Sequence, residues 1–355
     1  PPGSADADAA SSSMITIGGH QVGQDEPLFL QAELGVTANG DLATAYQLID
    51  AVAAAGADAA KFILTNPEAI TTAPDEPFTF ETVEGPRTVP IGPLLHETTF
   101  TPPEWQKIRD YCHHCGVLFF ATADCEEGVD FLESLNVPAH KISAWDLQHY
   151  PLVRRMVQTG KPVLIDMGPA TLAEMYGIAA VCPKEQRLLV HSPHPIQGRE
   201  WQLSRIWGQD DYAWGFSSPG REGWADFVAL GRGARLFEKR LTLSRSDMRG
   251  HHHAASLEPR EFSEWVSSMR HASVALAERP FGILSALSRE ERRRWGRSLY
   301  YRRALPAGSR VVSSDLSILR PAGGLAPDVA RTIEGRILVR PVTERGPVSW
   351  DDFAA

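Results

Sequence analysis

Eight short runs of apolar and β-branched residues recur along the chain, most of them separated by helical patterns and turn residues. We predict strands at Leu28–Glu33, Ala59–Leu64, Val117–Thr122, His140–Ser143, Pro162–Met167, Arg187–Ser192, Ala213–Ser217 and Arg235–Leu243. Between the first two, residues 42–55 keep apolar side chains at helical spacing, and Gly56 follows as a stop signal. Eight strands that alternate with helices over about 230 residues predict a (β/α)8 barrel.

The remainder of the chain has a different pattern. A long helix is predicted at Glu258–Ala277, and from Tyr300 onward short β runs such as Arg310–Val312 and Ile337–Val339 lie between Gly and Pro turns. We therefore expect a small β-rich domain after the barrel. The predicted boundaries are a disordered leader at 1–13, the barrel at 14–280, a linker at 281–296 and the small domain at 297–355.

Composition and charge narrow the classes of partner. The formal net charge is −9, and no dense Lys/Arg run stands apart from acidic neighbours, so we expect no nucleic-acid binding. No run of 18 apolar residues predicts a membrane span, and the first 13 residues lack the apolar core of a secretion signal, so a cytoplasmic location is expected. The run Cys112-His113-His114-Cys115 has no second pair and ends a helical pattern, which favours a helix end over a metal site.

Polar residues gather where the predicted strands end. In barrels of this class the chemistry lies at the carboxyl ends of the strands. Those ends carry Glu33, Lys61, Thr122, Lys141, Ser143, Asp166, His191, Ser192, Ser217, Ser218 and the run Glu238-Lys239-Arg240. The chain has only six lysines, and three of them are in this set. Lysines at such a mouth neutralise an anionic substrate or form a Schiff base with a carbonyl, and Glu33 suits acid–base work or hydroxyl binding.

Several longer segments then resemble one family. "FLQAELGVTANGDLATAYQLIDAVAAAGADAAKF", "TGKPVLIDMGPATLAEM" and "LFEKRLTLSRS" resemble the sialic acid synthases, and "LRPAGGLAPDVARTIEGR" resembles the antifreeze-like SAF domain of the same family. The resemblance runs from Met14 to Phe353. It implies a synthase barrel followed by a SAF domain, and a condensation of phosphoenolpyruvate with an aldehyde-bearing sugar. It also implies a homodimer in which each SAF domain covers the partner's active site.

The mouth and the resemblance together suggest roles for individual residues. We expect Glu33, Lys61, Lys141 and Asp166 to be catalytic. The residues expected to bind substrate are Thr122, Ser143, Ser192, Ser217, Lys239, His253 and Arg320. On this hypothesis Arg320 reaches from the SAF domain to the substrate of the other subunit.

The resemblance also implies a divalent metal, for which Mn, Fe or Zn would suit the ligands. His191 is expected at the first ligand position. The second family ligand is a histidine in Ser-Asp-His-Thr, and this chain has Pro219 at that place, so the usual two-histidine site cannot form. A site rebuilt from His191, Asp166 and either His194 or His252 stays open as an alternative.

Asp166 stands where the family has a phosphate-binding serine. Its charge beside a phosphate is repulsive by about 4 kcal/mol at ~4 Å and an effective dielectric constant of ~20, unless Lys141 or Lys239 pairs with it. The leading hypothesis is therefore a divergent sugar-acid synthase that uses phosphoenolpyruvate. The alternatives are a phosphoenolpyruvate-independent aldolase, lyase or dehydratase acting on a sugar-like carbonyl compound, and a non-catalytic binding protein.

Overall fold

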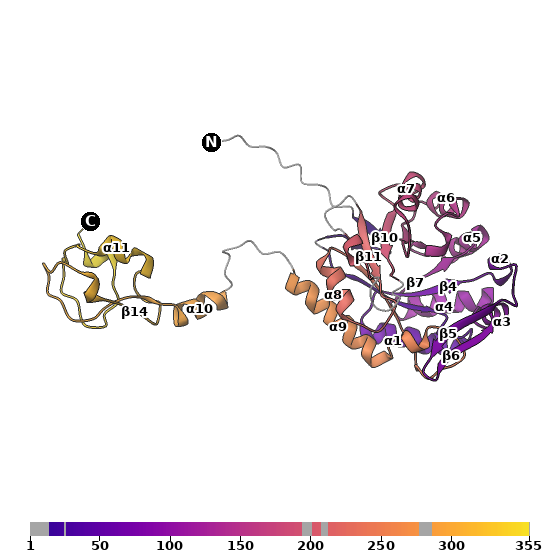
Figure 1. Ribbon diagram of the computed structural model, residues 1–355, viewed down its shortest axis with the longest axis horizontal. Helices are drawn as coiled ribbons and strands as arrows, with labels where there is room; N and C mark the ends of the chain where they lie inside the picture. Colours follow the sequence, from indigo (N-terminus) through magenta and orange to yellow (C-terminus); the bar gives the residue numbers. More distant parts are fainter. Residues whose placement is uncertain (1–13, 25, 194–200, 207–211, 277–285, 355) are drawn as a thin grey trace. The chain divides into compact units, whose positions relative to one another are not determined.

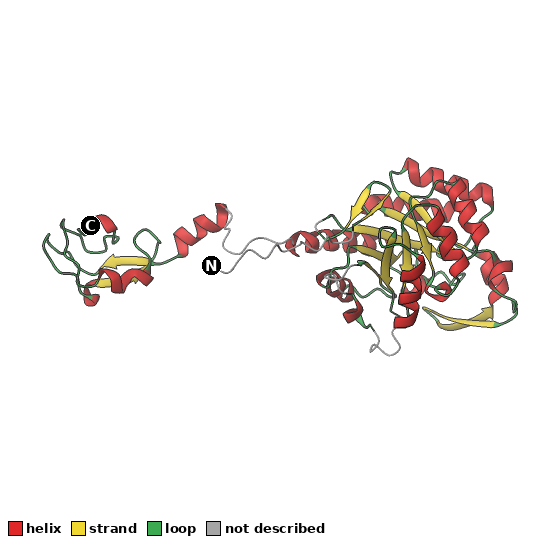
Figure 2. Ribbon diagram, turned by 90° about the horizontal axis from the view of Figure 1, so that it is seen from above, coloured by secondary structure: helices red, strands yellow, loops and turns green. Residues whose placement is uncertain are grey.

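All eight predicted strands are present and close into a parallel barrel in the computed structural model (Figure 1), which describes residues 14–24, 26–193, 201–206, 212–276 and 286–354. They are β3 (Phe29–Gly35), β4 (Ala59–Leu64), β7 (Leu118–Ala123), β8 (His140–Ile142), β9 (Val163–Asp166), β10 (Arg187–His191), β11 (Ala213–Ser217) and β12 (Leu236–Arg240). Their order around the barrel follows the chain, and β12 pairs with β3 to close it. Figure 2 shows the strands as an inner cylinder with helices outside it, which confirms the predicted fold class.

The helices between the strands have clear local causes. In α1 (Leu42–Ala55), the Asp41 side chain accepts hydrogen bonds from two free amides of the first turn, and Gly56 ends the helix at a φ of 73°. Leu48 and Val52 of this helix are fully buried in the barrel core. The other helices of the barrel unit with at least eight residues are α4 (Pro102–His114), α5 (Glu126–Ser134), α6 (Tyr150–Gln158), α7 (Leu172–Val181), α8 (Trp224–Gly231) and α9 (Pro259–Leu276).

Two hairpins were not predicted from the sequence. β1 (Ile15–Ile17) pairs with β2 (His20–Val22), and its apolar side chains belong to the barrel core. β5 (Pro77–Thr82) pairs with β6 (Gly85–Pro90) between β4 and β7. This second hairpin lies beside the loop after β12, because Arg87 donates a hydrogen bond to the carbonyl of Met248 and the ring of Phe78 lies 5.3 Å from that of His251.

The chain divides into two compact units, Pro1–Ala277 and Glu278–Ala355. In the second unit β13 (Ser298–Tyr301) pairs with β14 (Leu316–Leu319) over a separate apolar core. The predicted runs at 310–312 and 337–339 are not strands and meet only in an isolated bridge between Arg310 and Ile337. The predicted linker at 281–296 contains the helix α10 (Ala286–Trp295). No helix in the described part of the chain is both long and apolar enough to cross a membrane.

Candidate functional site

Six ionisable side chains meet at the carboxyl ends of the barrel strands, and we call them the mouth cluster. They are Glu33, Lys61, Lys141, Asp166, Glu238 and Arg240. The strand register explains the convergence, since Glu33 of β3 is the partner of Lys61 on one side and of Arg240 on the other. Glu238 and Arg240 are two residues apart on β12, so their side chains point to the same face of the strand.

The lysines of the cluster are held by carboxylates. Lys61 forms an ion pair with Glu33, and its Nζ lies 3.7 Å from Glu238 Oε2. Lys141 Nζ donates to both oxygens of Glu238 at 2.7 and 2.8 Å and lies 3.7 Å from Asp166 Oδ2. Glu238 also accepts hydrogen bonds from other side chains of the barrel wall, Gln31 and Ser217. Because the three acidic members balance the three basic members, the ionised cluster is neutral overall.

Burial and pairing act in opposite directions on these pKa values. Burial alone would lower the pKa of Lys141, but the carboxylates of Glu238 and Asp166 outweigh it and hold that pKa above its ordinary value. Burial would likewise raise the pKa of Glu238, but Lys141 and Lys61 hold it well below its usual range. For Asp166 burial dominates and raises the pKa, although Lys141 opposes the shift. The cluster therefore keeps Lys141 and Glu238 charged near neutral pH, whereas Asp166 takes up a proton more readily than an exposed aspartate does.

Lys239 does not lie at the mouth, contrary to the prediction. It alternates with Glu238 and Arg240 along β12, so its side chain points outward to helix α8. There its Nζ donates to Asp226 Oδ2 at 2.8 Å and to Ser218 Oγ at 2.9 Å, and only 1% of the residue is exposed. Glu238 and Arg240, which stand at this strand end in the sequence but were assigned no role, are the residues of β12 that face the mouth. Once the register is known, the period-2 pattern of β12 distinguishes them from Lys239.

His191 also does not face the mouth, contrary to the prediction. Its neighbour Val190 is the register partner of Asp166, whereas His191 is the partner of Phe216, whose ring lies 6.1 Å from its own. His191 Nε2 lies 2.7 Å from the carbonyl oxygen of Trp201, and burial lowers its pKa. His191 therefore lies on the outer face of β10, and Ser192 is the residue that alternation places on the mouth face.

The other predicted binding residues divide into two groups. Thr122 Oγ1 is 3.4 Å from Lys61 Nζ, and Ser217 Oγ donates to Glu238 Oε1 at 2.7 Å, so both contact the mouth cluster. Ser143, two residues beyond Lys141, accepts the amide of Trp145 and is half-buried. His253 is buried and lies 2.7 Å from Thr242 Oγ1, where it holds the loop after β12.

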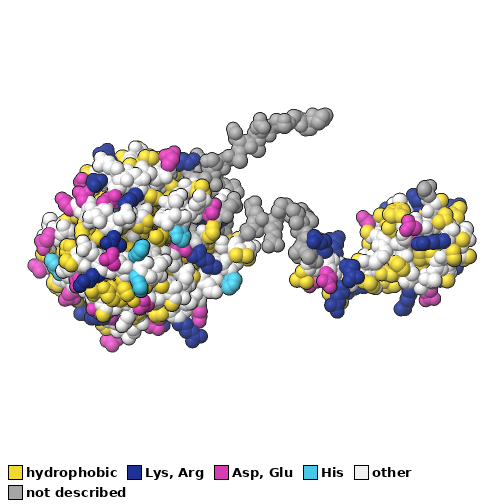
Figure 3. Space-filling model, turned by 180° about the vertical axis from the view of Figure 1, so that it is seen from behind, with side chains coloured by type: hydrophobic (Ala, Val, Ile, Leu, Met, Phe, Trp, Pro, Cys, Tyr) yellow, Lys and Arg dark blue, Asp and Glu magenta, His cyan; other side chains and the backbone are white. Residues whose placement is uncertain are grey.

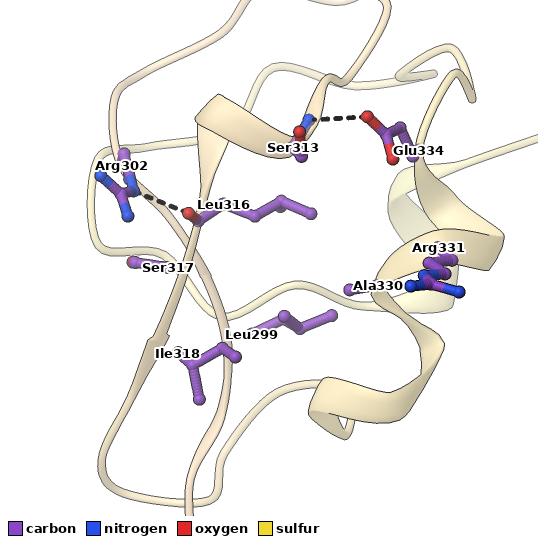
Figure 4. A pocket seen from close by; sticks show the side chains of 9 residues that line it. All are labelled: Leu299, Arg302, Ser313, Leu316, Ser317, Ile318, Ala330, Arg331 and Glu334. Carbon is purple, nitrogen blue, oxygen red and sulfur yellow. Dashed lines mark hydrogen bonds between the residues drawn. The ribbon is translucent and has the colours of Figure 1, made fainter.

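Arg320 belongs to the second unit and is exposed there. A groove of about 460 Å³ on that unit is shown in Figure 4. Arg302 on its wall donates to the carbonyl of Leu316 at 2.7 Å, and Glu334 accepts the amide of Ser313 at 3.3 Å. These charged groups thus bind main-chain atoms of their own unit, and the mouth cluster remains the better candidate for chemistry.

Comparison with known proteins then places the chain. A model of the NeuB family matches residues 48–280, and a model of the SAF domain matches residues 296–354. The chain belongs to the NeuB family. This finding confirms the resemblance noted in the sequence and, at the level of the family, the expectation of a NeuB-like enzyme.

Relatives of this NeuB-family chain are similar over nearly their whole length. It is 26% identical to N,N'-diacetyllegionaminic acid synthase of Legionella pneumophila, over 94% of this chain and 96% of the relative. It is 27% identical to the N-acetylneuraminate-9-phosphate synthase of Mus musculus, over 90% and 91% of the two chains. The crystal structure of an N-acetylneuraminic acid synthetase from Leptospira borgpetersenii, in complex with citrate, superposes with a TM-score of 0.67 at 26% identity and covers 79% of this chain and 95% of that one.

The predicted metal site does not fit the described residues of this NeuB-family chain. His191 faces away from the mouth, and Pro219 has no side-chain donor. Within the described ranges no group of three His, Cys, Asp or Glu side chains could hold a metal ion. The alternative that includes His194 falls outside the described residues. The disagreement concerns the ligands themselves, since the carboxylates of the mouth cluster are already paired with lysines.

The run His251-His252-His253 lies at the edge of the mouth. The rings of His251 and His252 are 4.2 Å apart, and His251 packs edge-on against Phe78 of the β5–β6 hairpin. Burial, with smaller contributions from Arg240, His251 and Lys61, keeps the pKa of His252 well below its ordinary value. His252 is therefore neutral near neutral pH mainly because it is buried, and the cations of the mouth add to this effect. Figure 3 shows acidic, basic and histidine side chains interspersed over one face of this unit.

Proposed function

We propose that the chain is a sugar-acid synthase that joins phosphoenolpyruvate to the aldehyde carbon of a sugar-like acceptor. The observation that carries the proposal is the convergence of Lys61 and Lys141, with Thr122 beside them, at the mouth of a NeuB-family barrel. Two relatives that match this chain over at least nine tenths of its length are named as synthases of sugar acids. The family match and the two lysines at the mouth both support an anionic substrate.

The proposed reaction balances with one water. The π electrons of the enol carbon–carbon bond form the new bond to the aldehyde carbon, and the carbonyl oxygen takes up its own π pair and then a proton. Water adds its hydroxyl group to the carbon that bears the phosphate and supplies that proton. Inorganic phosphate then leaves, and the product is a 2-keto acid extended by three carbons.

The protein's contribution in this proposal is charge and position. Lys61 and Lys141 exchange part of their pairing with Glu238 for pairing with the phosphate, so binding does not strand a buried ammonium group. Thr122 provides a hydroxyl group beside Lys61, and Ser217 provides one beside Glu238. Glu33, which accepts the amide of Gly35 at 2.6 Å, is held in place to bind hydroxyl groups or to move a proton.

Phosphate release tests the proposal directly. The full chain is incubated with phosphoenolpyruvate and a panel of N-acetylated hexosamines, and phosphate and the 2-keto acid are measured together. We expect both to appear in equal amounts and only when an acceptor is present. Phosphate release without an acceptor, or none with any acceptor, would contradict the proposal. A Lys141→Met variant provides the inactive control, because it removes a cation while keeping most of the side-chain volume.

A second function is favoured by one specific observation. Both lysines of the mouth already have carboxylate partners, and Asp166 adds a third acidic group where phosphate would lie. A cluster without net charge suits a neutral sugar-like carbonyl compound, on which an aldolase, lyase or dehydratase would act. Turnover of such a compound without phosphoenolpyruvate would support this alternative.

We also propose a cytoplasmic homodimer whose SAF domains cover the partner's mouth, with Arg320 reaching the partner's substrate. Light scattering on the full chain tests the dimer. Mixing Arg320→Ala chains with Lys141→Met chains tests the coverage, because a mixed dimer would recover one intact site. Activity of the mixture no higher than the sum of its parts would contradict it.

A further inference from the structure

Arg240 differs from the other cations of the mouth cluster. Lys61 and Lys141 each have a carboxylate oxygen within ion-pair distance. Arg240 has none among the described residues, and its one hydrogen bond to them runs from Nη1 to the carbonyl oxygen of Pro219 at 2.7 Å. A guanidinium group has five N–H donors, so most of its hydrogen-bonding capacity is not used by the described chain.

The hydrogen bond joins Arg240 to a position that matters for metal binding in the family. Pro219 occupies the place at which the resemblance to the family implies the second metal-binding histidine. The guanidinium group of Arg240 therefore lies against the backbone at the position where the resemblance implies a metal-binding histidine. A divalent ion and a guanidinium ion would both bring positive charge to this place, and each would exclude the other.

The neighbouring carboxylates help to keep the guanidinium group of Arg240 protonated. Burial lowers the pKa of Arg240, but the carboxylates of Glu33, Glu238 and Asp166 oppose that shift. An arginine stays protonated in proteins, so Arg240 is a fixed cation that does not depend on pH or on metal supply. Its hydrogen bond to the backbone of Pro219 orients it without neutralising it.

We propose that Arg240, in place of a divalent metal, binds the carbonyl oxygen of the aldehyde acceptor and stabilises the negative charge that forms on it. The inference rests on the proposed function. As the enol carbon attacks, the carbonyl electron pair moves to the oxygen, and the N–H groups of Arg240 hold the resulting alkoxide. The proton that neutralises the alkoxide comes from the attacking water, so the guanidinium group transfers none.

Metal binding tests the first half of the proposal and needs no substrate. Chelator-treated wild type, Arg240→Ala and Arg260→Ala are titrated with MnCl2, and free Mn²⁺ is followed by electron paramagnetic resonance. Arg260 is a matched control, because its exposed side chain lies on α9. We expect weak binding by wild type and Arg260→Ala. Arg240→Ala should bind Mn²⁺ at least ~10-fold more tightly than wild type. Without the guanidinium group, the three carboxylates of the mouth cluster outnumber its two lysines. Tight stoichiometric binding by wild type, or equal affinity in all three proteins, overturns the proposal.

Steady-state kinetics test the second half. Wild-type rates should be the same in excess chelator and in excess MnCl2. Arg240→Ala should lower kcat by roughly 10²–10³-fold, the loss typical of an oxyanion donor, while the KM for phosphoenolpyruvate stays within about twofold. Added guanidinium chloride should restore part of the rate. A chelator-sensitive wild type overturns the proposal, and so does a raised KM for phosphoenolpyruvate at unchanged kcat, which would assign Arg240 to the substrate carboxylate.

The experiments distinguish failure of the proposed synthase function from failure of the inference about Arg240. If wild type releases no phosphate with any acceptor, the synthase assignment and the carbonyl-binding role fall together. The manganese titration still decides whether Arg240 takes the place of the metal. If wild type is active but only with Mn²⁺, the synthase assignment stands and the inference about Arg240 is refuted.

Discussion

Glu238 Oε1 lies 2.7 Å from Lys141 Nζ, and the other oxygen of the same carboxylate lies 3.7 Å from Lys61 Nζ. One buried acid on β12 thus holds two lysines that come from two other strands of the barrel, β4 and β8. Without it, two ammonium groups would face each other in a poorly solvated site. Glu238 is therefore both a structural partner for the lysines and a competitor of any anionic ligand.

The first prediction concerns the stability that Glu238 provides. Glu238→Gln keeps the shape of the side chain but removes the charge that pairs with Lys141 and Lys61. We expect the free energy of unfolding to fall by about 2–4 kcal/mol, because buried cations lose their counter-ion. Urea denaturation followed by circular dichroism measures the change. Glu264→Gln on the exposed face of α9 should change stability by less than about 0.5 kcal/mol. Equal effects of the two substitutions would show that the mouth pairs are not stabilising.

The second prediction concerns acid sensitivity at the edge of the mouth. Burial, with a smaller effect of Arg240, lowers the pKa of His251 to about 4. In the unfolded chain a histidine takes up a proton near pH 6.5, so the folded state loses stability as the pH falls from about 7 toward 4. The loss due to His251 should be on the order of 2 kcal/mol between pH 7.5 and pH 5.

The substitution His251→Asn removes this titration and should reduce the pH dependence of unfolding over that window by about the same amount, while His252 and His191, whose pKa values burial also lowers, keep part of it. His113→Asn, at an exposed position of α4, should leave the pH dependence as in wild type. Parallel curves for wild type and His251→Asn would contradict the buried neutral state of His251.

The fold was largely predictable because each barrel strand is a short apolar run bounded by turn residues. Ala59–Leu64 and Ala213–Ser217 have the predicted bounds in the structure. The β5–β6 hairpin was missed because few of its side chains are buried, so its sequence lacks a regular apolar alternation. The runs near residues 311 and 338 were overpredicted, because an isolated bridge needs only one residue pair and leaves no pattern of its own.

The location of the mouth could be predicted from the sequence, but the identity of the residues that line it could be predicted only in part. Glu33, Lys61, Lys141 and Asp166 converge as expected, since the last residues of neighbouring parallel strands meet at one edge. The chemistry of His191 and Lys239 suits a binding site, but it does not show which face of the strand each residue occupies. At the ends of β10 and β12, adjacent residues point to opposite faces of the strand. A position that is one residue off therefore faces the helix layer instead of the barrel interior. The sequence does not show which of two adjacent polar residues faces inward until the register is known.

The third prediction separates these two faces of β12. Lys239→Met leaves Asp226 buried with the indole N–H of Trp265 at 3.1 Å and without its cation, so the free energy of unfolding should fall by about 3–5 kcal/mol. The double variant Lys239→Met/Asp226→Asn should recover a substantial part, because both charges are then absent. The KM for the substrate, measured on the folded fraction of the double variant, should equal that of wild type. A raised KM in the double variant would place Lys239 at the mouth, as the sequence first suggested.

The fourth prediction concerns the carboxylate that stands where phosphate would lie. Burial raises the pKa of Asp166, yet Lys141 lies 3.7 Å from it, so near neutral pH its charge competes with an incoming phosphate for the same ammonium group. Asp166→Ser removes this charge and keeps an oxygen that can accept the amide of Gly168, as Asp166 does at 3.1 Å. We expect the dissociation constant for phosphoenolpyruvate to fall at least ~10-fold, since a like charge at ~4 Å costs up to about 4 kcal/mol.

Thermal-shift titration in the presence of chelator measures this change, because a ligand that binds only the folded state stabilises it by RT ln(1 + L/Kd), where L is the free ligand concentration, and so raises the Tm more when the dissociation constant is smaller. Asp130→Ser on the exposed face of α5 removes the same charge far from the mouth and should not alter the titration. If Asp166→Ser binds phosphoenolpyruvate no more tightly than wild type, then Asp166 is already protonated or fully compensated by Lys141. The repulsion that favours a phosphoenolpyruvate-independent reaction would then not exist, and the synthase reaction would gain support from a negative result.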